Sequence, residues 1–209
     1  LVILVNFKDV KFKSTTAKAD FTALLNERGY SKNGATGSAN DYCRASTFEK
    51  FDPEFVVYGP YDLPEDMSYY GGNDASGNDK NPRQMVIDAC NAADKDVDFS
   101  QFDTDNDGKV DMVFIYYAGL NEAETNQADA IWPHKCALGG KAITKDGKSI
   151  NVYACTSELN YQGIMCGIGT FSHEFGHVLG LPDYYNTDNT SAFTVGDWDI
   201  MTSGSYNNA

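Results

Sequence analysis

Two histidines near the carboxyl end of the chain have the spacing of a metal-binding pair. His173 and His177 are two of only three histidines in 209 residues, and they lie four positions apart. On a helix this spacing places both imidazoles on one face, one turn apart, with Glu174 beside them. Two neutral imidazoles on one face supply half of a tetrahedral zinc site. Glu174 is then placed to take a proton from a metal-bound water, as in the H-E-x-x-H pattern, so these residues predict a catalytic zinc centre.

A catalytic zinc needs a third protein ligand and leaves its fourth position to water. Residues 178–209 contain no Glu, His or Cys, so a downstream ligand of a usual zinc-binding type must be an aspartate. The candidates are Asp183, Asp188, Asp197 and Asp199. Gly180 favours a helix end and Pro182 cannot continue a helix, so we expect a sharp turn after His177. That turn would bring Asp183 back to the metal, and we take Asp183 as the third zinc ligand.

A second group of metal-binding residue types lies in an acidic loop near the middle of the chain. Positions 1, 3, 5, 7 and 9 of a calcium-binding loop would be filled by the Asp103, Asp105 and Asp107 carboxylates, the Lys109 carbonyl and the Asp111 carboxylate. Gly108 at position 6 permits the sharp turn. Position 12 is Phe114, where an EF-hand has a bidentate Glu. We therefore expect a structural calcium ion of the extracellular kind, with an acidic turn that binds no ion as the alternative.

The remaining histidine and the cysteines form no further site that the sequence identifies. His134 is expected to make stabilising hydrogen bonds, with contact to substrate or metal as the alternative. The five cysteines are Cys43, Cys90, Cys136, Cys155 and Cys166, and they contain no C-x-x-C pair and no zinc-finger spacing. Their pairing is not deducible from sequence. The local expectation is a bridge among Cys136, Cys155 and Cys166, and the alternative is several buried free thiols.

The composition limits the classes of partner. A formal net charge of -14 disfavours nucleic acid and anionic membrane surfaces, because both are polyanions. The longest apolar run, residues 112–120, is far shorter than the roughly 20 residues that span a bilayer, so no membrane insertion is expected. The chain starts at Leu1 without the pattern of a signal peptide. We expect a fragment or a processed form from which a targeting segment, and a possible pro-segment, have been removed.

The hydrophobic pattern predicts the elements that position these residues. Continuous apolar runs at residues 1–7 and 110–118 indicate central strands that are buried on both faces. Residues 55–58 indicate a further strand, and an edge strand begins at Ile131 and Trp132. A hairpin is expected from residues 142–144 and 149–154 around the turn at 145–147.

Helices are expected at three places before the histidine pair. They cover residues 18–28, residues 38–50 with Ser38 as the N-cap, and residues 81–93 with Pro82 in the first turn. On the second of these helices, Tyr42 and Ala45 are expected to face inward. A fourth helix carries the histidines, and Thr170 or Ser172 is expected to cap it.

These motifs together resemble the immune-inhibitor-A family of secreted bacterial zinc metallopeptidases, of the metzincin type. His173, Glu174, His177, Gly180 and Asp183 fit the extended pattern H-E-x-x-H-x-x-G-x-x-H/D. Residues 199–204 are similar to the Met-turn that follows it, which implies that Met201 forms an apolar floor beneath the zinc. The resemblance also includes residues 1–7, 103–111, 131–134 and 181–185, and it is loose over residues 22–75.

The resemblance implies an α+β fold of the zincin or metzincin type, in which a twisted mixed β-sheet has a backing helix and an active-site helix. The helix at residues 38–50 would be the backing helix. We expect a single catalytic domain over residues 1–209, with an N-terminal lobe at about 1–180 and a short C-terminal lobe at about 181–209. The family usually continues through a C-terminal subdomain, so we expect this lobe to be truncated.

These observations predict a secreted zinc endopeptidase that acts on proteins or peptides and is a monomer. A zinc-activated water would attack the peptide bond, with Glu174 as the general base. Two alternatives stay open at this point. One is a catalytically incomplete binding or scaffold fragment with the same fold, and the other is a zinc hydrolase of non-peptide amides or esters.

Overall fold

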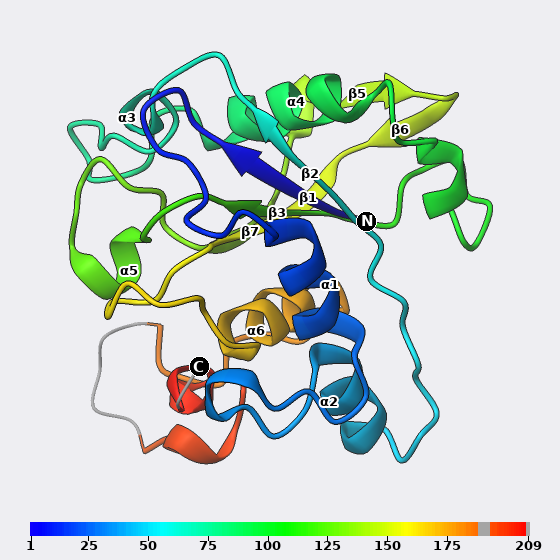
Figure 1. Cartoon of the computed structure of the whole chain (residues 1–209), viewed down its shortest axis with the longest axis vertical. Coiled ribbons are helices and arrows are strands. Elements are labelled where there is room, and N and C mark those ends of the chain that lie inside the picture. The colour runs from blue at the N-terminus through cyan, green and yellow to red at the C-terminus, as the bar shows by residue number, and fades with distance from the viewer. Residues whose placement is uncertain (188–192, 208–209) are drawn as a thin grey trace.

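A five-stranded mixed β-sheet forms the centre of the computed structural model, which describes residues 1–187 and 193–207 (Figure 1). Four strands run parallel to one another, and the last strand is antiparallel to its neighbour at one edge. In spatial order the strands are β2 (Val57–Asp62), β1 (Val2–Asn6), β3 (Val113–Tyr117), β7 (Val152–Ser157) and β4 (His134–Ala137). The expected mixed sheet is confirmed, and so are the central positions of the two most apolar strands.

Helices cover both faces of this sheet, which is why the inner strands carry apolar side chains in continuous runs. Ile3 and Val5 belong to one core with α4 (Pro82–Ala93). Val2 and Leu4 belong to a second core with α1 (Ala17–Asn26) and α6 (Gly169–Val178). Figure 1 shows α4 on one side of the sheet and α1 and α6 on the other. The active-site helix is therefore anchored to the sheet by its buried side.

The helix predicted at residues 38–50 is shorter than expected and does not back the sheet. Ser38 caps α2 (Ala39–Ser46) as expected, and its hydroxyl oxygen accepts a hydrogen bond from the Asp41 backbone N–H. The helix ends at Ser46 because Phe48 and Glu49 have positive φ values of 53° and 63°. The prediction that Ala45 faces inward is wrong, since it is exposed. The helix α2 packs against the side of α1 that faces away from the sheet (Figure 1). The helices that cover the sheet are α1, α4 and α6.

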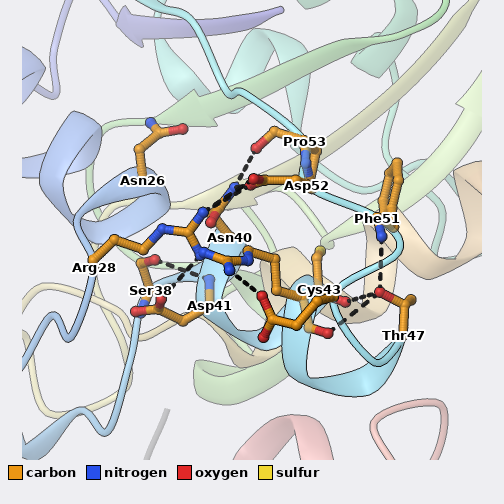
Figure 2. A network of polar contacts seen from close by, with 12 residues as sticks. Asn26, Arg28, Ser38, Asn40, Asp41, Cys43, Thr47, Phe51, Asp52 and Pro53 are labelled. Atoms are coloured by element: carbon orange, nitrogen blue, oxygen red, sulfur yellow. Dashed lines mark hydrogen bonds and ion pairs between the residues drawn. The ribbon is translucent and has the colours of Figure 1, made fainter.

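A polar network joins α1, α2 and the segment that leads into β2 (Figure 2). Arg28 donates to both carboxylate oxygens of Asp52, at 3.0 and 3.1 Å, and lies 3.6 Å from the Asp41 carboxylate. The buried Asn40 amide donates to Asp52 Oδ1 at 2.8 Å and to the Pro53 carbonyl at 2.6 Å. Both hydrogen bonds to Asp52 come from the same guanidinium nitrogen, Nη2, so this is a charge-assisted contact without the two-nitrogen fork geometry. The network thus fixes part of residues 22–75, the region of loose family resemblance, against α1 and α2.

Several strand limits differ from those predicted, because backbone hydrogen bonds leave the sheet. The strand predicted at residues 110–118 starts only at Val113, since Val110 N–H donates to Ser149 and Asp111 N–H donates to Phe102. The strand predicted at 55–58 runs instead from Val57 to Asp62, and the edge strand expected from Ile131 begins three residues later, at His134. The predicted hairpin is present as β5 (Ile143–Lys145) and β6 (Lys148–Ile150), but its second strand ends at Ile150, and residues 152–154 belong to β7 of the main sheet. Its turn residues, Asp146 and Gly147, have the positive φ values of a two-residue hairpin turn.

The expected disulfide is absent from the described residues, in which all five cysteines are free thiols. On the paired strands β4 and β7, Cys136 lies opposite Tyr153, and Cys155 lies opposite His134. The Cys166 thiol donates to the Ser157 carbonyl instead. The prediction of a bridge among these three cysteines is therefore wrong, and the alternative of free thiols describes the structure.

The remaining short elements lie around the sheet ends. They are two short helices, α3 (Met67–Tyr70) and α5 (Glu122–Thr125), and 3-10 turns at Lys32–Gly34, Phe99–Phe102, Gly139–Lys141, Gly196–Trp198 and Ser203–Tyr206. None of the helices in the described ranges is long and apolar enough to cross a bilayer.

Candidate active site

The helix α6 presents two different faces because its side chains repeat every four residues. Phe171 and Phe175 pack against Phe55, with ring centroids 5.0 and 5.3 Å from it. The opposite face carries His173 and His177, whose rings are 4.7 Å apart. The helix begins after Ile168 without a side-chain cap, so the prediction that Thr170 or Ser172 caps it is wrong. Packing of the two phenylalanines fixes the direction in which the histidines point.

A Schellman motif ends this helix and returns the chain to the histidines. Gly180, with a φ of 95°, donates to the His177 carbonyl at 3.1 Å, and Leu181 donates to the Gly176 carbonyl at 3.0 Å. The chain then brings Asp183 Oδ1 to 3.4 Å from His173 Nε2 and 3.2 Å from His177 Nε2. The turn expected from the glycine thus places all three predicted zinc ligands together.

The spacing of these three donor atoms fits a tetrahedral metal. Zinc bonds of about 2.0–2.1 Å give a distance of about 3.3 Å between neighbouring ligand atoms of a tetrahedron, close to the two distances observed. Asp183 Oδ1 is buried and has no hydrogen-bond partner. A buried carboxylate oxygen that faces two imidazole nitrogens without a proton between them is unfavourable unless a cation lies among them. The donor set therefore suits zinc on geometric and electrostatic grounds.

Backbone carbonyls hold both imidazoles in one orientation. His173 Nδ1 is 2.8 Å from the Ile200 carbonyl oxygen, and His177 Nδ1 is 2.8 Å from the Leu181 carbonyl oxygen. A proton on each Nδ1 satisfies these carbonyls and leaves the Nε2 lone pairs directed at the Asp183 side. Metal-binding histidines commonly make such a hydrogen bond through the ring nitrogen that does not bind the metal.

The turn at residues 199–204 lies directly beneath the helix. Met201 is 1% exposed, and a Cβ added at Gly176 would lie 2.6 Å from its sulfur, so only glycine permits this approach. Asp199 Oδ1 accepts from the Met201 backbone N–H at 2.7 Å and so stabilises the turn. In the described ranges neither Asp199 nor Asp197 joins the histidines, and Asp188 lies outside those ranges. Of the four candidate aspartates, the structure brings Asp183 to the site.

Glu174 lies on the same helix face and is almost completely buried. It is 5% exposed, and its Oε2 atom has no hydrogen-bond partner. Burial raises the pKa of Glu174 to about 7, with a smaller opposing effect from His134. It borders a cavity of about 390 Å³ that His173, His177 and Asp183 also line. Glu174 therefore has one carboxylate oxygen without a hydrogen bond beside the three residues that could bind a metal.

The edge strand β4 forms another wall of the cavity through His134 and Lys135, and Trp132, just before the strand, also lines it. His134 is hydrogen-bonded as expected, with Nε2 2.8 Å from the Tyr153 hydroxyl and Nδ1 2.7 Å from the Trp132 carbonyl. Both ring nitrogens are occupied, so the ring braces the rim of the cavity.

Two side chains near the cavity, Tyr185 and Asp79, have no role predicted from sequence, whereas the sequence identifies Tyr206 as a residue that could approach the metal. Tyr185 and Tyr206 line the cavity, and burial, followed by the Asp183 charge, raises the pKa of Tyr185 to about 12. Asp79 lies behind the rim, where its Oδ2 accepts from the Trp132 N–H at 3.2 Å while Oδ1 is buried without a partner. The adjacent tyrosine pair at 184 and 185 was the one sequence signal for this group, and Asp79 had none.

We expect Asp79→Asn to stabilise the fold above pH 6 and to change little near pH 4. Burial raises the pKa of Asp79 from 3.8 to about 6; the Trp132 N–H and His134 oppose this shift, and Glu122 adds to it. Because the pKa of Asp79 is higher in the folded than in the unfolded state, its contribution to the free energy of unfolding is complete below about pH 3.8 and is lost as pH rises through about 6. Thermal melts at pH 4 and pH 8 measure the difference. Asp74→Asn is the control, since backbone N–H groups lower the pKa of Asp74 and its substitution should destabilise at pH 8. Equal responses of the two variants would contradict this account.

The acidic loop brings together part of the predicted calcium set. The carboxylates of Asp103, Asp105 and Asp111 converge, with their closest oxygens within 4.8 Å of one another. Asp107 does not join them, because its carboxylate pairs with the Lys109 ammonium group. The buried Asp103 carboxylate accepts from Lys148 Nζ at 2.6 Å. Lysines thus compensate part of the negative charge of this loop.

Fold and site together define a metallopeptidase: a mixed sheet, a helix with two histidines and an adjacent glutamate, and an aspartate returned by a glycine turn. The chain belongs to the family described as immune inhibitor A peptidase M6, catalytic domain, which matches residues 1–209. The chain is therefore a member of a family of peptidase catalytic domains.

Two relatives show the extent of the match. The chain is 28% identical over 247 residues to the pre-pro-metalloprotease PrtV of Vibrio cholerae serotype O1. This match covers 99% of the present chain and 27% of the Vibrio protein. The chain is 27% identical over 247 residues to immune inhibitor A of Bacillus thuringiensis subsp. alesti, with 99% and 36% coverage. The chain thus spans about a quarter to a third of the length of these relatives.

Proposed function

We propose that this protein is a zinc endopeptidase in which His173, His177 and Asp183 hold the metal and Glu174 is the general base. The observation that carries the proposal is the convergence of two imidazole Nε2 atoms and one unpartnered carboxylate oxygen at 3.2–3.4 Å. A bound zinc lowers the pKa of water towards neutrality and polarises a carbonyl group.

The protein's own residues supply the proton transfers. Glu174 faces the cavity with a free oxygen, and burial raises its pKa above the ordinary carboxyl value, which makes it a stronger proton acceptor. It would take the proton of the attacking water and pass it to the leaving amine. The buried environment keeps bulk water from competing for this proton.

An extended substrate would lie along β4. This strand pairs with β7 on one side only among the described elements, and Trp132, His134 and Lys135 line the cavity. A free strand edge offers backbone hydrogen bonds to an extended peptide, whatever its side chains. We propose that β4 aligns the peptide across the metal and Glu174, which favours protein and peptide substrates.

Digestion of casein or gelatin with and without a chelator tests this proposal. We expect cleavage by the full-length protein, loss of cleavage with 1,10-phenanthroline, and recovery on addition of zinc. Cleavage that persists after the metal has been removed would overturn the zinc mechanism. A metal-loaded, folded protein that cleaves no peptide would instead support a scaffold role or a non-peptide substrate.

We further propose that the acidic loop binds calcium and that the protein acts outside the cell as a monomer. The convergence of Asp103, Asp105 and Asp111 supports the site, with Asp107 and the Lys109 carbonyl joining after the lysine ammonium groups move away. The Vibrio relative is named a pre-pro-metalloprotease, which supports processing and export. The residues here would form one catalytic domain with a short C-terminal lobe that follows α6.

Calcium at about 10 mM should raise the melting temperature of the domain by about 5 °C or more. A site of the extracellular kind, with a Kd of about 0.1 mM, would gain about 2.7 kcal/mol at a hundredfold excess. Asp105→Asn should remove most of this shift, whereas Asp98→Asn, an exposed acid bonded to Ser100, should preserve it. Scanning calorimetry with calcium and with magnesium measures the effect. Equal shifts in both variants would refute this site.

A further inference from the structure

A second cavity opens beside the proposed active site and contains a fixed carboxylate. It has a volume of about 340 Å³ and shares Ala123, Thr170 and Tyr206 with the cavity at the histidines. Thr170 lies one helical turn before His173 and Glu174 on α6, on the same helix face. The two cavities are therefore adjacent compartments of one cleft. A peptide held across Glu174 would have a side chain at the mouth of the second compartment.

Glu124 is the charged group in the lining of this cavity, and its position is rigid. Its Oε1 atom accepts from Asn121 Nδ2 at 2.9 Å, and its Oε2 atom accepts from the Tyr161 backbone N–H at 2.9 Å. Asn121 is 1% exposed, and its amide also donates to Ser157 Oγ at 2.9 Å. These contacts fix the carboxylate before any substrate arrives.

The carboxylate keeps capacity for another donor. A carboxylate has about four lone-pair sites, and the two hydrogen bonds use two of them. Within the described ranges, no Lys or Arg lines this cavity or pairs with Glu124. The other lining groups are neutral, among them Asn160, Tyr161 and Cys166. A preorganised anion without a cation partner in a cavity of side-chain size attracts a cationic side chain.

We propose that this compartment is a specificity pocket in which Glu124 selects an arginine or lysine side chain next to the scissile bond. The proposal rests on the proposed peptidase function and names a substrate class for it. Arginine would suit the site especially, because its planar guanidinium presents paired donors to a carboxylate. The protein would then cleave preferentially beside basic residues.

Two measurements on the full-length protein test this pocket. The first is a positional peptide library, in which we expect Arg and Lys to be enriched at one position flanking the cleaved bond. Replacing that Arg by the neutral norleucine should lower kcat/KM about tenfold, the factor that corresponds to one moderately favourable charge pair. In Glu124→Gln the factor should fall to about one, because the neutral amide no longer attracts the guanidinium group.

Glu122→Gln is the matched control, because Glu122 lies on the same short helix but bonds to Asn73 and does not line the cavity. It should keep the full preference for arginine. The preference of the unmodified protein should also weaken at high salt, as expected for a solvent-accessible charge pair. A library profile without basic residues, or an unchanged profile in Glu124→Gln, would overturn the proposal.

The second measurement does not depend on turnover. In a Glu174→Gln background, calorimetry with uncleaved peptides that differ only by Arg or norleucine should show about tenfold tighter binding of the Arg peptide. Adding Glu124→Gln should equalise the two, and equal binding without it would refute the pocket. If the unmodified protein cleaves nothing but this binding difference persists, the peptidase proposal fails and the pocket stands.

Discussion

Replacing Glu174 by glutamine is expected to abolish peptide hydrolysis while leaving zinc binding intact. The glutamine side chain has nearly the same shape, so it fits the buried position at the floor of the cavity. It cannot accept a proton at neutral pH, and the step assigned to Glu174 is lost. Removal of a general base typically costs 10² to 10⁴-fold in rate, and we expect kcat/KM to fall by about 10³-fold or more.

The measurement is kcat/KM on a fluorogenic peptide, combined with the zinc content and zinc affinity of the purified variant. Glu122→Gln serves as the control, since it makes the same chemical change on an element outside the zinc-binding group. Zinc affinity within a few-fold of the unmodified protein would show that Glu174 is not a ligand. Near-normal turnover by Glu174→Gln would refute the role of Glu174 as the base.

The part of the site that sequence predicts is the part encoded by local geometry. The four-residue spacing of His173 and His177 fixes their shared helix face, and it needs no information from elsewhere in the chain. Gly180 predicts a helix end, and the Schellman hydrogen bonds at that end turn the chain so that Asp183, three residues after Gly180, returns to the histidines. Short-range backbone rules therefore suffice for all three proposed ligands.

The residues that sequence did not reveal reach the site through long-range packing. Glu124 and Tyr161 meet across 37 positions, and Asp79 and Trp132 meet across 53. No periodicity or turn signal predicts such pairs, because they depend on how β3, β7 and β4 are ordered in the sheet. The early end of α2 was missed for a different reason: Phe48, a residue type that rarely takes a positive φ, lies in the left-handed conformation just after the helix.

Replacing Asp183 by alanine is expected to weaken zinc binding at least about a hundredfold. Loss of a residue that is hydrogen-bonded to a metal ligand typically lowers metal affinity 10–100-fold, and loss of a direct ligand should lower it more. The substitution also removes the one anionic ligand of the proposed metal, which would keep only two neutral imidazoles as ligands. Zinc titration against a chelating indicator measures the affinity, and activity should fall with it.

Asp197→Ala provides the control, since Asp197 is an exposed downstream aspartate whose side chain does not join the group. Its zinc affinity should stay unchanged. Zinc should also stabilise Asp183→Ala less than it stabilises Asp197→Ala, because a ligand that binds only the folded state stabilises it by RT ln(1 + [L]/Kd). At fixed zinc, a hundredfold weaker Kd removes about 2.7 kcal/mol of that stabilisation when the metal is in large excess. Unchanged affinity in Asp183→Ala, together with a loss in Asp199→Ala, would move the third ligand to the turn beneath the helix.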